Sequence, residues 1–264
     1  MEQHPKKEEK EMYKLFKGFY ELTSGMLSQT RNLNVISNNM VNTMTPGYKK
    51  DRYLSSTFRE VLMSRSGNRD KSNKDELGET TSAMINASDL VSIDYSIGSV
   101  DQTDSKLDFA LTKNGFFQIQ TENGVLYTRN GSFITDDEGY LSLPNQGRVL
   151  GQNGEIQLNS DDIQVDTSGA IYTADGLYID TLAIVDFPDY TQLRKTGEGL
   201  FQGAGDATPV EDAVMWKALE LSNVSAIEEM SDMISSQRAL QSSAQLLKMY
   251  DEIISRASTD LGRI

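Results

Sequence analysis

The chain has 264 residues, and 25 Lys and Arg against 39 Asp and Glu give it a net charge of −14 at pH 7. This charge repels nucleic-acid phosphates and anionic lipid surfaces, so we expect neither nucleic acid nor a membrane surface as a partner. With no cysteine and one histidine, His4, the sequence predicts no thiolate or histidine metal site and no cysteine nucleophile, and only His4 could serve a Ser-His-Asp triad.

The first twelve residues form a charged extension, 1–12, with no apolar core after it. No run of about 18 apolar residues occurs anywhere in the sequence. We therefore expect neither direct membrane insertion nor a cleavable secretory signal, and a protein of this kind would leave the cytoplasm by another route.

Residues 13–44 are predicted to form a long helix with one apolar seam. Apolar residues recur at alternating steps of four and three, with Gln29 in the one gap, which is a heptad pattern. Gly18 and Gly25 each weaken such a helix by up to about 1 kcal/mol relative to alanine, so we expect it to need a partner. The candidate interface residues of this seam are Leu15, Phe19, Leu22, Met26, Leu33, Ile36 and Met40.

A turn is predicted directly after this helix, at Thr45, Pro46, Gly47 and Tyr48. Proline prevents the helix from continuing, and Pro-Gly is the central pair that a type II turn prefers. We interpret the turn as a joint rather than an active site. The segment 45–99 is predicted to be a linker and exposed loop, because residues 64–79 contain a single large apolar residue.

The central segment, 100–210, is predicted to be an antiparallel β domain. Short β-rich runs alternate with Asn-Gly and Asp-Gly pairs, which supply the positive φ angles of tight hairpins. Residues 101–190 hold 15 acidic and four basic residues and so carry −11 of the net charge. The close pairs Asp136-Asp137-Glu138 and Asp161-Asp162 lack the ligand spacing of a calcium loop, and we interpret them as a solvated acidic face. We predict no catalytic residue, metal ion or cofactor.

The last segment, 211–264, is predicted to carry a second long helix. Ser225 and Glu228 have the spacing of a capping box. Gln237 and Gln241 interrupt the apolar stripe that follows, whose candidate interface residues are Leu240, Ala244, Leu247, Tyr250, Ile254 and Leu261. The predicted fold class is α+β: long N- and C-terminal helices that pair as a coiled-coil layer, with a central antiparallel β-rich domain between them.

Three blocks of sequence resemble the bacterial flagellar basal-body rod and hook family. The first, 25–49, ends in an asparagine-rich helix terminus and Thr45-Pro46-Gly47-Tyr48-Lys49. The second comprises 108–117 and Tyr127-Thr128-Arg129-Asn130-Gly131-Ser132-Phe133, and the third is Glu220-Leu221-Ser222-Asn223-Val224. The blocks come in the family's order and lie at both ends and in the centre of the chain.

The resemblance implies a non-enzymatic structural subunit that self-assembles through its terminal helices into the hollow rod, the drive shaft from motor to hook. It further implies a helical homopolymer that also contacts neighbouring rod and hook proteins. The expected location is the basal body outside the cytoplasm, in the periplasm or cell-wall zone, after export through the flagellar type III apparatus without a cleaved signal peptide. The central block and the length favour a rod protein, proximal or distal, over a hook or hook-associated protein; a glycan-acting β-domain enzyme is the alternative from another class.

Overall fold

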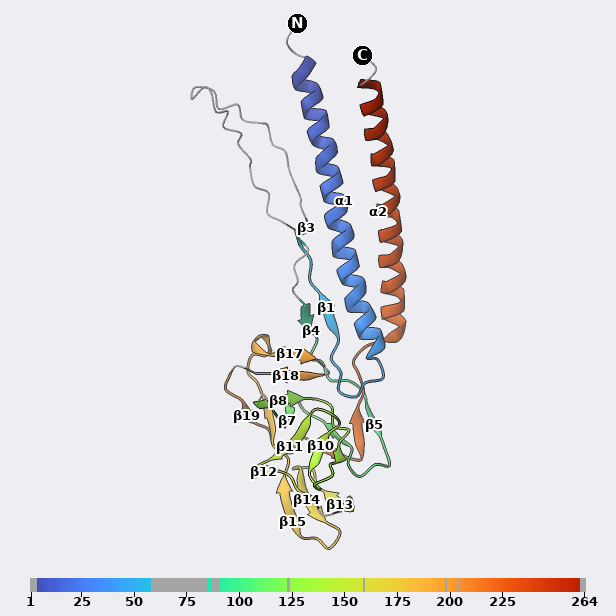
Figure 1. The fold of residues 1–264 in the computed structure, drawn as a ribbon. Helices are drawn as coiled ribbons and strands as arrows, with labels where there is room; N and C mark the ends of the chain where they lie inside the picture. The colour runs from blue at the N-terminus through green and yellow to red at the C-terminus, as the bar shows by residue number, and fades with distance from the viewer. Residues whose placement is uncertain are drawn as a thin grey trace, which may run out of the picture. The chain divides into compact units, whose positions relative to one another are not determined.

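The computed structural model describes residues 4–57, 85–86, 91–122, 124–158, 160–197, 199–203 and 205–261 (Figure 1). The chain is mixed α+β, with a long helix near each end and antiparallel strands between them. It divides into two compact units, one formed by the described parts of 1–38, 51–92 and 227–264, the other by those of 39–50 and 93–226.

The first unit is built around the two helices, α1 (His4–Val41) and α2 (Ala226–Leu261), which run side by side in opposite directions (Figure 1). α1 begins nine residues before the predicted start at residue 13, because the lysines and glutamates of the charged extension are good helix formers. It ends at Val41 rather than at residue 44, since the chain turns at once towards Pro46. The coiled-coil character of the pair stays a prediction.

A short ribbon completes the described part of this unit. β1 (Asp51–Tyr53) pairs with β4 (Val91–Ile93), and β2 (Ser56–Thr57) pairs antiparallel with β3 (Ile85–Asn86). These strands lie within the predicted linker 45–99, and the loop predicted at 64–79 lies outside the described residues.

The second unit contains a ten-stranded antiparallel sheet whose central path is β17-β18-β8-β7-β11-β10-β9. β12 pairs with β11, β16 with β7, and β19 with β16. The strands are β7 (Phe116–Thr121), β8 (Gly124–Thr128), β9 (Ile134–Thr135), β10 (Leu141–Leu143), β11 (Gly147–Gly151), β12 (Gly154–Glu155), β16 (Ile184–Asp186), β17 (Arg194–Gly197), β18 (Leu200–Gln202) and β19 (Thr208–Pro209).

Smaller pairings surround this sheet. β13 (Ile163–Val165), β14 (Ala170–Thr173) and β15 (Tyr178–Thr181) form a three-stranded sheet, and η1 (Tyr190–Gln192) is one turn of 3₁₀ helix. β20 (Val214–Trp216) pairs with β6 (Phe109–Leu111), and β21 (Ala218–Glu220) pairs with β5 (Val100–Gln102). Most of residues 214–220 in the segment 211–264 are thus strands of the second unit, which we call the β unit. α2 begins only after them.

Two apolar cores lie on opposite faces of β7. Because neighbouring side chains of a strand point to opposite faces, Phe117 and Ile119 enter the larger core while Phe116 enters the smaller one. The smaller core is aromatic: the Phe116 ring packs against Phe187 and Phe201 with centroids 6.1 and 5.5 Å apart.

Acidic residues of the predicted acidic face form the hairpin turns. The Asp136 carboxylate accepts hydrogen bonds from the backbone N–H groups of Glu138 and Tyr140, at 3.0 and 2.8 Å. Asp166 repeats the arrangement 30 residues later, accepting from the N–H groups of Ser168 and Ala170 at 3.0 Å each. In each turn the glycine three residues after the aspartate has a φ of 85°, which only glycine adopts without strain.

These turns lower the pKa values of their aspartates. The hydrogen bond from Tyr140 N–H, with lesser help from Arg148, lowers the pKa of Asp136. Burial opposes the shift at Asp166, but bonds from the Ser168 side chain and the Ala170 backbone still lower its pKa. Among the described residues, no group of three or more His, Cys, Asp or Glu side chains could hold a metal ion.

We predict that acid destabilises the β unit through these turns. Both folded-state pKa values lie below the unfolded value of about 3.9, so the stabilisation is complete above that pH and is lost as the pH falls through the folded-state values. Asp136→Asn should flatten the fall of Tm measured by circular dichroism between pH 5 and 2. Asp137→Asn is the control, because the Asp137 carboxylate has no hydrogen bond or ion pair within the described structure; equal slopes for both variants would contradict the assignment.

Candidate functional site

The two helices meet at contacts that fix one antiparallel register. The Asn32 side-chain amide donates to the Ser236 hydroxyl at 3.1 Å. At the other end of the pair, a Cβ on Gly18 would lie only 2.7 Å from the Tyr250 hydroxyl, so glycine permits the close approach. Gly18 and Asn32 are two heptads apart, as are Ser236 and Tyr250, so the two contacts agree on the register.

The covered face of α2 follows a strict four-three spacing. The predicted seam residues Leu240, Ala244, Leu247, Tyr250 and Ile254 are all half-buried. Ser243 is covered as well, and towards the N-terminus the covered positions continue through Ser236, Met233 and Glu229. Gln237 and Gln241 are exposed. Ser236 and Ser243 were not predicted as seam residues because serine is not apolar. Their heptad spacing does indicate that they lie on the covered face.

The predicted seam of α1 is also covered. Ile36 is buried, and Phe19, Leu22, Met26, Leu33 and Met40 are half-buried. The side chains of Leu15 and Leu261 lie outside the described residues. The covered face is broader than predicted, because Gly18, Gly25 and Asn32 lie in it as well, and Gln29 is half-buried at its predicted place in the seam.

The exposed side chains on the remaining face of α1 are uncharged, and the charged residues Glu21 and Arg31 are half-buried. Between residues 18 and 41, the exposed residues are Tyr20, Thr23, Leu27, Thr30, Asn34, Ser37, Asn38 and Val41. We call Tyr20, Thr23, Leu27, Thr30, Asn34 and Ser37, which keep a three-four spacing, the uncharged face of α1.

The turn after α1 is held against the β unit. Gly47 has a φ of 68° and Tyr48 N–H donates to Thr45 C=O at 3.3 Å, the geometry of a type II turn with Pro46 at its first corner. A Cβ on Gly47 would lie 2.3 Å from the Arg129 carbonyl carbon, so no other residue fits. Tyr48 is buried, and its hydroxyl donates to the Asn39 side-chain oxygen at 3.3 Å.

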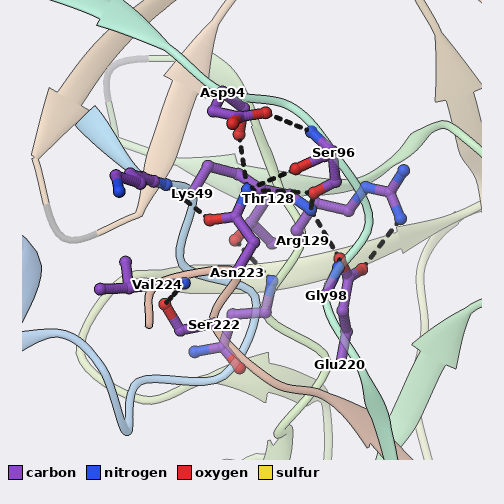
Figure 2. A network of polar contacts seen from close by, with 12 residues as sticks. Lys49, Asp94, Ser96, Gly98, Thr128, Arg129, Glu220, Ser222, Asn223 and Val224 are labelled. Carbon is purple, nitrogen blue, oxygen red and sulfur yellow. Dashed lines mark hydrogen bonds and ion pairs between the residues drawn. The ribbon is translucent and has the colours of Figure 1, made fainter. Parts of the chain in front are cut away.

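Next to this turn lies a buried charge cluster, Lys49, Arg129 and Glu220 (Figure 2). The Glu220 carboxylate accepts from Lys49 Nζ at 2.6 Å, from Arg129 Nη1 at 2.9 Å and from Gly98 N–H at 2.9 Å. All three charged side chains are at least 98% buried. Burial lowers the pKa of Lys49, and the Glu220 carboxylate opposes that shift.

Asn223 extends the cluster towards the start of α2 (Figure 2). Its side-chain oxygen accepts from Lys50 N–H at 2.7 Å, and its amide donates to the backbone oxygens of Asp94 and Ser96 at 2.8 and 3.2 Å. The segments that follow α1 and precede α2 are therefore tied to each other and to the β unit. The sequence did not predict this cluster, because Glu220 lies 91 residues from Arg129 and 171 residues from Lys49. Each of the three residues belongs to one of the three blocks that resemble the family.

In sequence, the chain is thus a pair of helices at its two ends with a β-rich unit inserted between them. The family described as "Flagellar hook protein FlgE/F/G D1 domain" matches residues 110–173, and "Flagellar basal body rod FlgEFG protein C-terminal" matches residues 217–260. These segments contain Arg129 and Glu220.

Several relatives that match along most of the chain are flagellar rod proteins. The flagellar basal-body rod protein FlgG of Agrobacterium fabrum is 30% identical over 264 residues, covering 90% of this chain and 97% of the relative. FlgG of Buchnera aphidicola from Schizaphis graminum is 30% identical over 89% of this chain and 96% of its own, and FlgG of Bacillus subtilis is 29% identical over 91% and 97%. The chain belongs to the flagellar basal-body rod protein family. No helix in the described ranges is long and apolar enough to cross a membrane.

We predict that Glu220 is the member of the cluster whose loss costs most. Glu220→Gln leaves two buried cations without a carboxylate and should lower the free energy of unfolding by roughly 3–5 kcal/mol. Lys49→Met should cost less, because Arg129 still neutralises Glu220. Urea unfolding followed by tryptophan fluorescence measures both. Lys106→Met is the control, since its ion pair with Asp162 is exposed and should contribute below about 1 kcal/mol; equal losses for Glu220→Gln and Lys49→Met would contradict this charge balance.

We also predict that the two glycines of α1 respond differently to alanine. A Cβ on Gly25 meets nothing within 4 Å, so Gly25→Ala should stabilise the helix pair by up to about 1 kcal/mol. Gly18→Ala should gain less, because its Cβ displaces the Tyr250 hydroxyl, and Tyr250→Phe should restore part of the gain. Thermal unfolding monitored at 222 nm gives the double-mutant cycle. A response of Gly18→Ala that is independent of Tyr250 would contradict the helix packing.

Proposed function

We propose that this protein is a structural subunit of the bacterial flagellar rod that assembles with further copies of itself through α1 and α2. Family membership supports the rod assignment. The uncharged face of α1 is the observation that carries the assembly mechanism.

A helix face in permanent contact with water normally carries charged residues. The uncharged face of α1 has none, in a chain with 24% charged residues, and it includes Tyr20 and Leu27 at 60 and 49% exposure. α1 already packs against α2 on its other side, so this face is available for contact with a neighbouring copy of the chain. Burying it would contribute roughly 25 cal/mol per Å² of apolar area, a stabilisation that the single chain does not obtain.

The helix pair is suited to a coiled-coil layer. Its seam keeps heptad spacing on both helices, and we propose that Leu15 and Leu261 extend it beyond the side chains that are described. A contact between the uncharged face of one copy and a different surface of the next is heterologous, and its repetition builds an open helical polymer when the rotation between copies does not close a ring. We propose that this polymer is the hollow shaft.

The buried charge cluster suits the transmission of torque. Within the second unit it ties the segment after α1 and the strand before α2 to the β-strands, with hydrogen bonds of 2.6–2.9 Å to a single carboxylate. We propose that the subunit works without a cofactor, between neighbouring rod and hook proteins, outside the cytoplasmic membrane. Export through the flagellar type III apparatus would bring it there.

A hook subunit is the second candidate, because the family matching residues 110–173 includes hook proteins. A rod subunit should form a straight polymer and a hook subunit a curved, bendable one. Electron microscopy of the polymer separates the two.

We predict that Leu27→Asp abolishes rod assembly without unfolding the subunit. Leu27 is half exposed, so the free energy of unfolding of the monomer should change by no more than about 0.5 kcal/mol. In cells whose only copy is the variant, motility and recovery of the chain in isolated basal bodies should be lost. Gln241→Asp adds the same charge at an exposed site of α2 and should leave motility normal. Motile Leu27→Asp cells would overturn the role of this face.

A further inference from the structure

One buried aspartate connects the hairpin of β11 and β12 to the neighbouring three-stranded sheet. Asp180 lies in β15 and is 5% exposed. Its carboxylate accepts hydrogen bonds from the Asn153 side-chain amide at 2.9 Å and from the Asn153 backbone N–H at 3.3 Å. The Thr181 N–H donates to the same carboxylate at 2.7 Å. Asn153 thus binds a buried carboxylate through both of its N–H donor groups.

The carboxylate has little room to move away from this turn. A Cβ on Gly151 would lie 2.4 Å from Asp180 Oδ2, so the backbone of β11 packs directly against it. Gln152 N–H donates to Thr181 C=O at 2.9 Å and holds the turn against β15. Two carboxylates that share a site cannot both ionise without a large cost in free energy. The contact therefore requires a neutral donor at position 153.

Asn153 is followed by Gly154, a pair whose own atoms can remove this donor. The backbone nitrogen of the glycine attacks the side-chain Cγ of the asparagine. The N–Cγ bond forms as the Cγ–Nδ2 bond breaks, and ammonia leaves with the proton of the backbone nitrogen. Water then opens the five-membered imide at either of its carbonyl groups, which leaves an aspartate or an isoaspartate at position 153.

The Asn-Gly pairs of the described ranges differ in the space around the glycine. A Cβ built on Gly154 meets nothing within 4 Å, and Asn153 is exposed. A Cβ on Gly131 would lie 1.8 Å from the Phe109 carbonyl oxygen. One on Gly115 would lie 3.2 Å from a side-chain carbon and a carbonyl oxygen. The backbone shift that imide formation needs is therefore open at Gly154 and obstructed at the other two glycines.

We propose that Asn153 is a site of spontaneous deamidation and that its conversion separates the β11–β12 hairpin from Asp180. Attack requires the Asn153 side chain to leave Asp180, which local opening of an exposed turn permits. The reaction is irreversible in its effect, because the new carboxylate repels Asp180 where the amide had donated to it. An isoaspartate also adds one carbon to the backbone of a two-residue turn.

Ageing of the purified full-length chain tests the site. The chain is incubated at mildly alkaline pH, and peptide mass spectrometry follows the gain of about 1 Da at each asparagine. Electron-transfer fragmentation separates aspartate from isoaspartate. We expect position 153 to convert several-fold faster than positions 114 and 130. Conversion at 153 that is equal to theirs or slower would overturn the assignment.

A pair exchange tests the consequence. Asn153→Asp, which reproduces one product, should lower Tm at pH 7 by about 5 °C or more. Adding Asp180→Asn to the same chain restores an amide beside a carboxylate with the two positions exchanged, and should recover most of the loss. Asn114→Asp is the control, because it adds the same charge at an exposed site and should change Tm by less than about 2 °C. Equal losses from Asn153→Asp and Asn114→Asp, or no recovery in the double variant, would overturn the proposed role of Asp180.

Discussion

The Glu220 carboxylate is the group on which the arrangement of the second unit depends. It binds Lys49, which follows α1, Arg129 at the end of β8, and the backbone of Gly98, while its own residue ends the last strand before α2. A buried ion cluster is rarely the most stabilising solution for a core, but each member is expensive to leave unpaired. Segments that start far apart in sequence are therefore held in one arrangement, since any other leaves a charge buried alone.

The helix pair is stabilised in a different way from the buried charge cluster. Its seam contains glycines, serines, an asparagine and a glutamine beside the apolar residues, so the pairing of α1 with α2 buries less apolar area than an all-leucine seam would. The exposed faces retain apolar residues instead, on the uncharged face of α1 and along α2. In the proposed assembly, neighbouring copies would cover these faces and add to the stability of the helices.

Most of the net negative charge lies in the β unit, whereas the surfaces proposed for assembly lie on the helices. Its aspartates are used for local geometry, as Asp136 and Asp166 show, where the carboxylate closes a hairpin turn and a glycine with positive φ completes it. Residues 101–190 carry −11 of the net charge of −14, so most of the negative charge lies in this unit.

Local patterns in the sequence determined the parts of the fold that depend on near neighbours. The heptads, the Asn-Gly and Asp-Gly turns and Thr45-Pro46-Gly47 predicted two long helices, an antiparallel β domain and the turn between them, because periodicity and turn chemistry act over a few residues. The start of α1 at His4 and the strands at 214–220 were not predicted, since helix ends and short strands depend on tertiary packing.

Only the tertiary structure decided which distant residues meet. Nothing in the spacing of Lys49, Arg129 and Glu220 says that they share one buried site, and the choice of Ser236 over Gln237 as a seam residue depends on how α2 is rotated against α1. The exposed apolar residues of the helices follow from the same rotation: a helix has one apolar face by sequence, but which part of it stays open is set by the partner that covers the rest.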